Sequence, residues 1–159
     1  MAIYMKFEGI DGQVKAVGFK DWIELDSCSL GISRHTSLGM GGRGREGAHP
    51  EISEIMVTKK FDKATPKILR ESVAGTFDKK VDIKWTTTTK SKTDTYFHVE
   101  LEKCGITQYS QSSNPEMVPM ESLSLNFLKI TFSPSPLDDA GTPKKGDVVH
   151  YNLSELKSG

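Results

Sequence analysis

The chain has 159 residues, 36% of them hydrophobic and 26% charged, and its 21 lysines and arginines balance 21 aspartates and glutamates. A chain of this length buries roughly 70% of its unfolded surface in one domain without a metal or a disulfide. Its zero net charge excludes a basic field that would attract nucleic acid or an anionic membrane, and no apolar run approaches the roughly 20 residues that span a bilayer.

The N-terminal third of the chain has the pattern of strands. Residues 3–7 alternate apolar and polar side chains and end in a Gly9-Ile-Asp-Gly12 turn, which predicts a half-buried strand. A second strand is expected over 21–34, apolar at its ends and polar in its centre, where Ser27 and Ser29 lie. The polar centre predicts that one face of this strand is in contact with water.

Residues 36–50 contain five glycines and no hydrophobic period. A loop of this length in a compact domain is usually disordered or reserved for a partner. The pattern G-x-G-x-x-G occurs twice, but a phosphate-binding loop joins a strand directly to a helix. Here His49-Pro50 and another expected strand, 51–61, follow the glycines. We therefore predict a flexible, projecting loop rather than a nucleotide site.

One stretch, residues 65–76, has the period of a helix. Thr65 and Pro66 form a suitable N-cap and first-turn pair, and Gly75 is expected to adopt left-handed backbone near the end. A helix of about three turns is not stable alone in water, so its apolar stripe is predicted to pack against a sheet. The stripe consists of Ile68, Leu69 and Val73.

The remaining sequence predicts four more strands. They are expected over 81–89, 97–109, 121–132 and 148–153. The first two form a long antiparallel hairpin, and a polar loop is expected over 110–119. The apolar residues of 121–132 change phase midway, which indicates a bulge or a strand that is covered on both faces at one end.

Together these elements predict a mainly β fold, an antiparallel barrel or sandwich of about seven strands with one short α-helix over about 65–76. Long strands in such a fold raise the question of free edges, which proteins cover, charge or pair with another subunit. The two cysteines, Cys28 and Cys104, lie in apolar strand contexts and are expected to be buried free thiols.

The sequence contains no motif that places a nucleophile, a base and an orienting group together, so we predict no enzyme activity, no metal and no cofactor. Four scattered histidines, which are the only support for a small hydrolase, are expected on the surface or in hydrogen bonds. They are His35, His49, His98 and His150. The features that remain favour assembly. The alternative is a monomeric β-sandwich binding module, for example for carbohydrate, with 36–50 as its recognition site.

Several stretches carry a family resemblance. They are the opening Ile3-Tyr-Met-Lys-Phe-Glu-Gly-Ile-Asp-Gly12, the segment Val57 to Leu69, the strands around Trp85 and Glu100, and the strand Glu121 to Phe132. These residues resemble the haemolysin-coregulated protein (Hcp) family of bacterial type VI secretion over nearly the whole chain. Asp62-Lys-Ala-Thr-Pro66 is the most specific part.

The resemblance implies a phage tail-tube-like fold and a six-membered ring of subunits around a channel. Rings would stack into an inner tube with a spike protein at its tip and a contractile sheath and baseplate as further partners. The channel would bind and carry small effector proteins. Residues 1–159 would then form a single tube domain with no appended effector domain, present in the bacterial cytoplasm during assembly and later secreted without a signal peptide.

The resemblance also assigns roles to two groups of residues. Ser27 and Ser29 would face the channel and its effectors. A loop would reach the neighbouring ring, and it consists of Leu38, Gly39, Met40, Gly41, Gly42, Arg43, Gly44, Arg45, Glu46 and Gly47.

Overall fold

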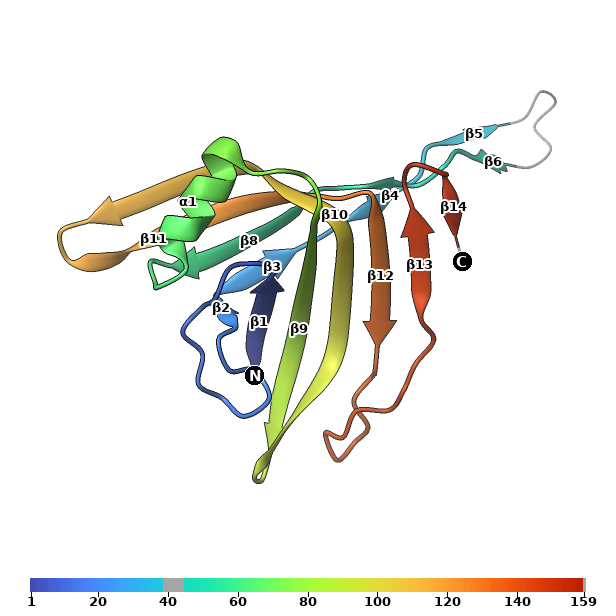
Figure 1. Cartoon of the computed structure of the whole chain (residues 1–159). Helices are drawn as coiled ribbons and strands as arrows, with labels where there is room; N and C mark the ends of the chain where they lie inside the picture. The colour runs from blue at the N-terminus through green and yellow to red at the C-terminus, as the bar shows by residue number, and fades with distance from the viewer. Residues whose placement is uncertain (39–44, 159) are drawn as a thin grey trace.

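The computed structural model describes residues 1–38 and 45–158. Within them the chain forms one helix and two packed antiparallel sheets (Figure 1). The helix is α1 (Thr65–Ala74). The strands are β1 (Ala2–Phe7), β2 (Ile23–Leu25), β3 (Ser27–Ser29), β4 (Ile32–Ser33), β5 (Thr36–Leu38), β6 (Arg45–Gly47), β7 (Glu51–Ile52), β8 (Ile55–Lys60), β9 (Lys79–Thr89), β10 (Lys92–Asn114), β11 (Met117–Asn126), β12 (Lys129–Pro134), β13 (Val149–Asn152) and β14 (Lys157–Ser158).

The two sheets share the long strand β10. Sheet A has the order β2-β1-β9-β10-β12-β13-β14, and sheet B has the order β10-β11-β8-β3. Residues 92–104 of β10 pair with β9 and β12, whereas residues 105–114 pair with β11. The chain passes between the sheets again at Asp26, which separates β2 from β3. The result is a sandwich whose sheets are joined at two corners.

The predicted fold class is confirmed, because the structure is mainly β and antiparallel with one short helix. Within the described residues, seven of the 14 strands are four residues or longer, but they are not the seven expected, because residues 21–34 form only short strands and residues 121–132 contribute to two. The two sheets enclose a single apolar core that alternating residues of each strand fill. Fully buried members from the central strands are Val81, Ile83, Val99, Leu101 and Leu125. Both cysteines are free thiols, Cys28 half-buried and Cys104 fully buried.

Two strand predictions, over 21–34 and 121–132, were wrong because the chain crosses between sheets within each, and the loop prediction over 110–119 was also wrong. The expected strand 21–34 is broken into β2, β3 and β4, with the crossing at Asp26. The expected strand 121–132 is two strands, β11 in sheet B and β12 in sheet A, with the chain turning at Phe127 and Leu128. Each of the two strands directs its own alternating set of apolar residues at the core, and the chain turns between the two sets. This turn explains the phase change in the sequence. The expected loop 110–119 is instead the β10–β11 hairpin, in which residues up to Asn114 and from Met117 are paired.

A charged cluster is buried where β8, β10, β11 and the start of α1 meet. Lys59 and Glu121 have exposed fractions of 0% and 1%, and their side chains form an ion pair. Lys59 Nζ also lies 2.8 Å from Asp62 Oδ1. Thr65 Oγ1 and Tyr109 OH donate hydrogen bonds of 3.0 and 2.7 Å to the two Glu121 oxygens. Burial and the bond to this carboxylate raise the pKa of Tyr109 far above its ordinary value.

Helix α1 begins at this cluster rather than at a simple cap. Thr65 is the first helical residue, and its hydroxyl accepts a 3.0 Å hydrogen bond from the Asp62 N–H while donating to Glu121. The helix ends at Ala74, and Gly75 has extended backbone (φ −74°, ψ 165°), so the expected left-handed conformation was wrong. The Thr65 hydroxyl therefore joins the helix start to the core.

The predicted packing of the helix stripe was also wrong. Ile68 is fully buried, but Leu69 is 39% and Val73 86% exposed. The helix lies against β10 at one end of the sandwich, so only one side of it meets the chain's own core. The rest of the apolar stripe faces outward.

Replacing Lys59 by methionine should lower the free energy of unfolding by about 3–5 kcal/mol, because it leaves the Glu121 carboxylate buried without a cation. Adding Glu121→Gln to that variant should recover part of the loss, since the buried charge is then removed. Urea unfolding at one fixed protein concentration measures both. Lys60→Met, on the exposed side of the same strand, is the matched control and should change stability by less than about 0.5 kcal/mol. Equal effects of Lys59→Met and Lys60→Met would contradict this role.

Candidate functional site

The outer face of sheet B is polar and nearly uncharged. The register of its four strands places outward side chains in cross-strand rows. These rows are Ser110, Ser122, Thr58 and Ser27, then Gln108, Ser124, Met56 and Ser29, then Ser112, Met120 and Lys60. Lys60 is the one charged residue in these three rows. We call this surface the hydroxyl face.

Ser27 and Ser29, the two serines singled out from the sequence, both lie on the hydroxyl face and are exposed. Ser27 Oγ is hydrogen-bonded to Thr58 Oγ1 on the neighbouring strand. Cys28 between them points to the core, and burial raises the pKa of its thiol to about 12. The alternation of the strand thus separates two hydroxyls on the outside from one thiol on the inside.

Sequence reasoning missed most of the hydroxyl face. The signal was present, because serines alternate with larger residues in Ser110-Gln-Ser112 and in Ser122-Leu-Ser124. The first of these segments fell inside the predicted loop 110–119, which concealed its period of two. Only the pairing of β10 with β11 and β8 brings the serines of separate segments into one surface.

The outer face of sheet A has the opposite character, since it is densely charged. Lys80 Nζ lies 3.5 Å from Glu100 Oε1, and Lys129 Nζ lies 3.6 Å from Glu102 Oε2. These pairs join neighbouring strands across the sheet and are partly exposed, so each contributes little stability alone. The sandwich therefore presents one uncharged and one charged face.

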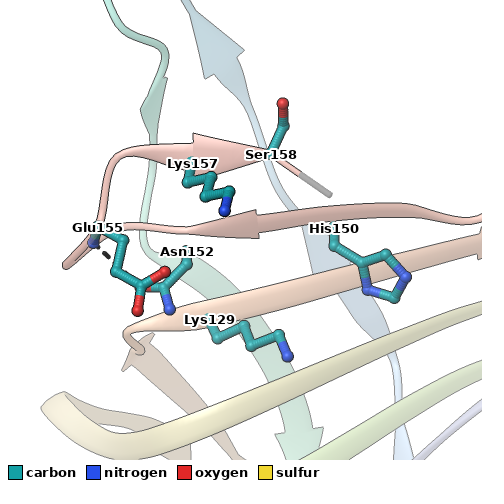
Figure 2. A pocket seen from close by; sticks show the side chains of 6 residues that line it. All are labelled: Lys129, His150, Asn152, Glu155, Lys157 and Ser158. Carbon is teal, nitrogen blue, oxygen red and sulfur yellow. Dashed lines mark hydrogen bonds between the residues drawn. The ribbon is translucent and has the colours of Figure 1, made fainter.

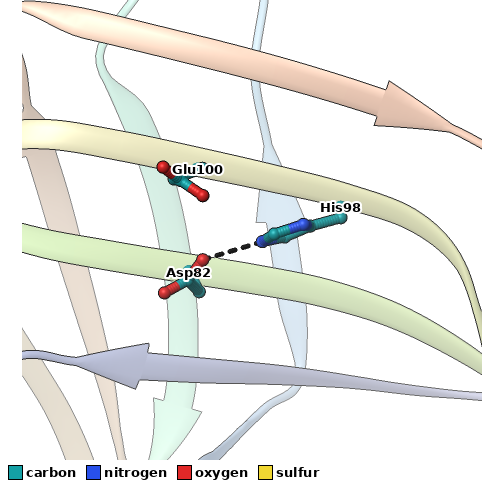
Figure 3. A group of neighbouring side chains, drawn as sticks. All are labelled: Asp82, His98 and Glu100. Carbon is teal, nitrogen blue, oxygen red and sulfur yellow. Dashed lines mark hydrogen bonds and ion pairs between the residues drawn. The ribbon is translucent and has the colours of Figure 1, made fainter. Parts of the chain in front are cut away.

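Three side chains that commonly bind metals lie together on sheet A. Ligand atoms of Asp82, His98 and Glu100 are all within 4.8 Å of one another, and Figure 3 shows His98 directed at Asp82 across the two strands. His98 Nε2 is 2.8 Å from Asp82 Oδ1, while Glu100 pairs with Lys80. Burial opposes ionisation of Asp82, but the hydrogen bond and charge of His98 outweigh it and lower the pKa of Asp82. The group is accounted for as a network of ion pairs.

A shallow depression of about 330 Å³ lies beside β13 and β14. Lys129, His150, Asn152, Glu155, Lys157 and Ser158 line it. Figure 2 shows these side chains spread along the strands rather than converging on one point. His150 Nδ1 shares a 3.0 Å hydrogen bond with Thr131 Oγ1. The depression has a basic rim but no arrangement that would hold a reacting group.

The four histidines lie in two regions: His35 and His49 are near each other, since the Ala48 N–H donates a hydrogen bond to the His35 carbonyl, and His98 and His150 lie on β10 and β13. His35 and His49 are exposed, whereas His98 and His150 are each hydrogen-bonded to a neighbouring strand. Within residues 1–38 and 45–158, no helix has the length and apolar character required to cross a membrane.

A two-stranded ribbon extends sheet B beyond the sandwich. The β3–β8 pairing continues as β4–β7 and then β5–β6, and we call residues 30–38 and 45–54 the arm. The pairing is interrupted between β3–β8 and β4–β7, and again between β4–β7 and β5–β6. At each interruption two residues of the first strand lie opposite three of the second, so the register shifts by one residue as in a bulge. Figure 1 shows the arm projecting away from the sheets. Residues 31–37 are exposed throughout, and Ile32 is 55% exposed.

The arm corrects the prediction of an irregular loop over 36–50, because Thr36–Leu38 and Arg45–Gly47 form a ladder. Arg34 Nε donates a 3.1 Å hydrogen bond to the Ala48 carbonyl. Its guanidinium lies over Gly47, where an added Cβ would be 2.1 Å from Nη2, so a larger residue at 47 would displace the arginine side chain. Of the predicted ring-stacking loop, Gly39, Met40, Gly41, Gly42, Arg43 and Gly44 lie outside the described residues.

Sheet B ends in two different edges. Among the described residues, β3 pairs only with β8, and residues 105–114 of β10 pair only with β11. All three strand pairs of sheet B are antiparallel, so β10 and β3 run in opposite directions. Unpaired strand edges are sites where another strand can add.

Comparison with known families matches residues 4–133 to the family described as "Type VI secretion system effector, Hcp". A solved type six secretion system protein has a TM-score of 0.89 at 21% identity, covering 99% of both chains. Hcp1 from Salmonella typhimurium has a TM-score of 0.73 at 16% identity, covering 99% of this chain and 98% of that one. A type VI secretion system effector from Yersinia pestis has a TM-score of 0.71 at 16% identity, covering 94% and 98%.

At these identities the solved structures show a shared fold. No protein of curated function matches the sequence.

The ion pair between Asp82 and His98 predicts how the free energy of unfolding changes with pH. Because the folded protein lowers the pKa of Asp82, the pair's contribution to stability is present above the ordinary value of about 3.9 and is lost as pH falls through the lower folded value. Asp82→Asn should therefore flatten the decrease of unfolding free energy between pH 5 and 2, as measured by urea unfolding. His98→Gln should flatten it too. Unchanged pH slopes in both variants would exclude the coupling.

Proposed function

The chain belongs to the Hcp family of type VI secretion, and from this membership we propose that it is a structural subunit that forms six-membered rings, stacks into the inner tube and carries small effector proteins. The observation that supports the proposal most directly is that sheet B has two unlike edges, neither of which is paired further within the described part of the chain. The spike protein, sheath and baseplate are the other partners expected of such a subunit. It would assemble in the bacterial cytoplasm before it is secreted.

The two edges are suited to pair with each other in separate copies. Across sheet B the strands β10, β11, β8 and β3 alternate in direction. If β3 of a second copy lies beside residues 105–114 of β10, the antiparallel alternation continues without interruption. Because the contacting edges differ, the contact is head-to-tail, and such a contact generates a closed ring when its rotation closes. The number of subunits in the ring, six, is the number expected from the family.

The hydroxyl face is the proposed wall of the channel, with Ser27 and Ser29 among its lining residues. Short hydroxyl and amide side chains offer donors and acceptors to many polar surfaces. The scarcity of fixed charge on this face avoids strong repulsion of cargo of either sign. The charged face of sheet A would then lie away from the channel, toward the surrounding components.

The arm is the proposed contact between stacked rings. A ribbon of two strands is at best marginally stable in water, because it buries little apolar surface. Here the arm exposes Ile32 and most of its described side chains, although Leu30 and Ile52 at its base pack against the core. Packing against a neighbouring ring would bury this surface, and we propose that residues 38–47 take part.

Removing the outer arm should separate ring formation from stacking. The Ala48 N–H donates a 2.9 Å hydrogen bond to the His35 carbonyl, so residues 36–47 can be replaced by an Asn-Gly turn that joins strands already side by side. We expect light scattering to give the mass of the wild-type ring and electron microscopy to show no tubes under conditions in which the wild type stacks.

Replacement of Lys90 and Ser91 by Asn-Gly at the β9–β10 turn is the matched control and should leave tubes intact. Tubes formed by the arm variant would refute the stacking role. A wild type with the mass of one subunit at high concentration would refute the ring and favour a monomeric binding module.

A larger side chain on the hydroxyl face should weaken cargo retention. Ser29→Gln keeps the surface uncharged but fills space in the proposed channel, so we expect the ring mass to be unchanged. Mass spectrometry should detect fewer small proteins co-secreted with the ring from the host strain. Ser133→Gln, on the outer face of sheet A opposite His98, is the control. Equal co-secretion with both variants would remove Ser29 from the channel wall.

A further inference from the structure

Two carboxylates stand directly opposite each other on the outer face of sheet A. The register pairs Glu100 of β10 with Asp82 of β9, and both side chains are half-buried. Like charges in directly opposite positions destabilise a sheet. His98 lies two residues before Glu100 on the same strand, so its imidazole is on the same face. A cation held between the three side chains would remove the repulsion.

The ion pairs described above leave part of this group's bonding capacity unused. His98 Nε2 is hydrogen-bonded to Asp82 Oδ1. Lys80 Nζ lies 3.5 Å from Glu100 Oε1, but the lysine side chain is 53% exposed, so a metal ion can displace it at little cost. Within residues 1–38 and 45–158, no hydrogen bond reaches the Glu100 carboxylate, which is 28% exposed. The two carboxylates therefore retain lone pairs for a further cation.

The other nearby lysines have partners elsewhere. Lys6 and Lys84 are the cross-strand neighbours of the group on β1 and β9. The Lys6 ammonium lies 3.0 Å from Asp11 Oδ1. The Lys84 ammonium lies 5.3 Å from the centre of the Trp22 ring, which is a cation–π contact. Both ammonium groups are thus stabilised by residues outside the group.

The spacing of the three side chains fits one metal ion. Their ligand atoms all lie within 4.8 Å of one another, and Figure 3 shows His98 directed at Asp82 with Glu100 beside them. Ligands held at about 2.1 Å in a tetrahedron are about 3.4 Å apart, so small side-chain rotations suffice. One imidazole nitrogen and two carboxylate oxygens are a donor set that Zn²⁺ accepts, whereas Ca²⁺ and Mg²⁺ prefer oxygen alone.

We propose that Asp82, His98 and Glu100 together bind Zn²⁺, with water in the fourth position. The ion would join β9 to β10 and neutralise the two opposed carboxylates. The sequence predicted no metal, because Asp82 is 16 residues from His98 and only the strand register brings them together. The site is independent of the proposed ring, and it lies on the face that would be directed away from the channel.

Calorimetric titration of the chelator-treated wild-type protein with ZnCl₂ tests the site. We expect one Zn²⁺ per subunit. Asp82→Asn, His98→Gln and Glu100→Gln should each lower the association constant by at least about tenfold, because each removes one ligand. The controls are His150→Gln and Glu102→Gln. They remove the same kinds of side chain from the same face outside the group and should leave the association constant unchanged.

X-ray absorption separates this site from zinc binding by cysteine. The zinc spectrum should show nitrogen and oxygen ligands at about 2.0–2.2 Å and no sulfur at about 2.3 Å. Cys28 and Cys104 are the two thiols of the chain. The spectrum is recorded on the wild type, so it does not depend on the folding of a variant.

Three outcomes would overturn the proposal. They are a wild type that does not bind Zn²⁺, an association constant that His98→Gln leaves unchanged, and sulfur among the zinc ligands. Loss of binding in the three variants but not in the controls, together with a spectrum without sulfur, would establish the site. Neither result bears on ring formation, which light scattering measures separately.

Discussion

The buried ion pair between Lys59 and Glu121 is the constraint on which the rest of the structure depends. A lysine and a glutamate with no exposed surface are tolerated only when both charges have partners, and here Asp62, Thr65 and Tyr109 supply them. These partners come from the start of the helix and from the strands of sheet B. The cluster therefore ties the beginning of α1 to sheet B and determines where the helix runs. A helix held at this position covers β10 with one side and leaves its apolar stripe outside.

The second constraint is the sharing of β10 between the sheets. Because one strand serves both sheets, residues 105–114 leave sheet A and form an edge of sheet B that has no partner on its far side among residues 1–38 and 45–158. The crossing at Asp26 produces the complementary edge at β3. The same geometry turns one polar surface, rich in serine, and one charged surface in different directions. The proposed ring, channel and stacking arm all use features that follow from these two crossings.

Much of the fold could be predicted from local pattern. Alternation identified the principal strands, and Thr65-Pro66 marked the start of the helix. The predictions failed where a residue's environment depends on distant segments. Val73 looked like a core residue because it lies one helical turn after Leu69 in the predicted stripe, yet the core has room for only one side of the helix. Ser27 and Ser29 were identified on a wet strand, but Ser110 fell inside a predicted loop and Ser122 lay on a strand that was not predicted to be near them.

The sequence by itself determined the antiparallel β class, the single helix, the free cysteines and the family, since these depend on periods and motifs that are local in the chain. Only the tertiary structure decided which outward side chains share a face, which strand edges remain unpaired, and which side of α1 is exposed. The physical reason is that register and sheet crossing bring together residues such as Lys59 and Glu121 that are far apart in sequence. Such a pair forms only when the whole core is assembled, so no local pattern of residues predicts it.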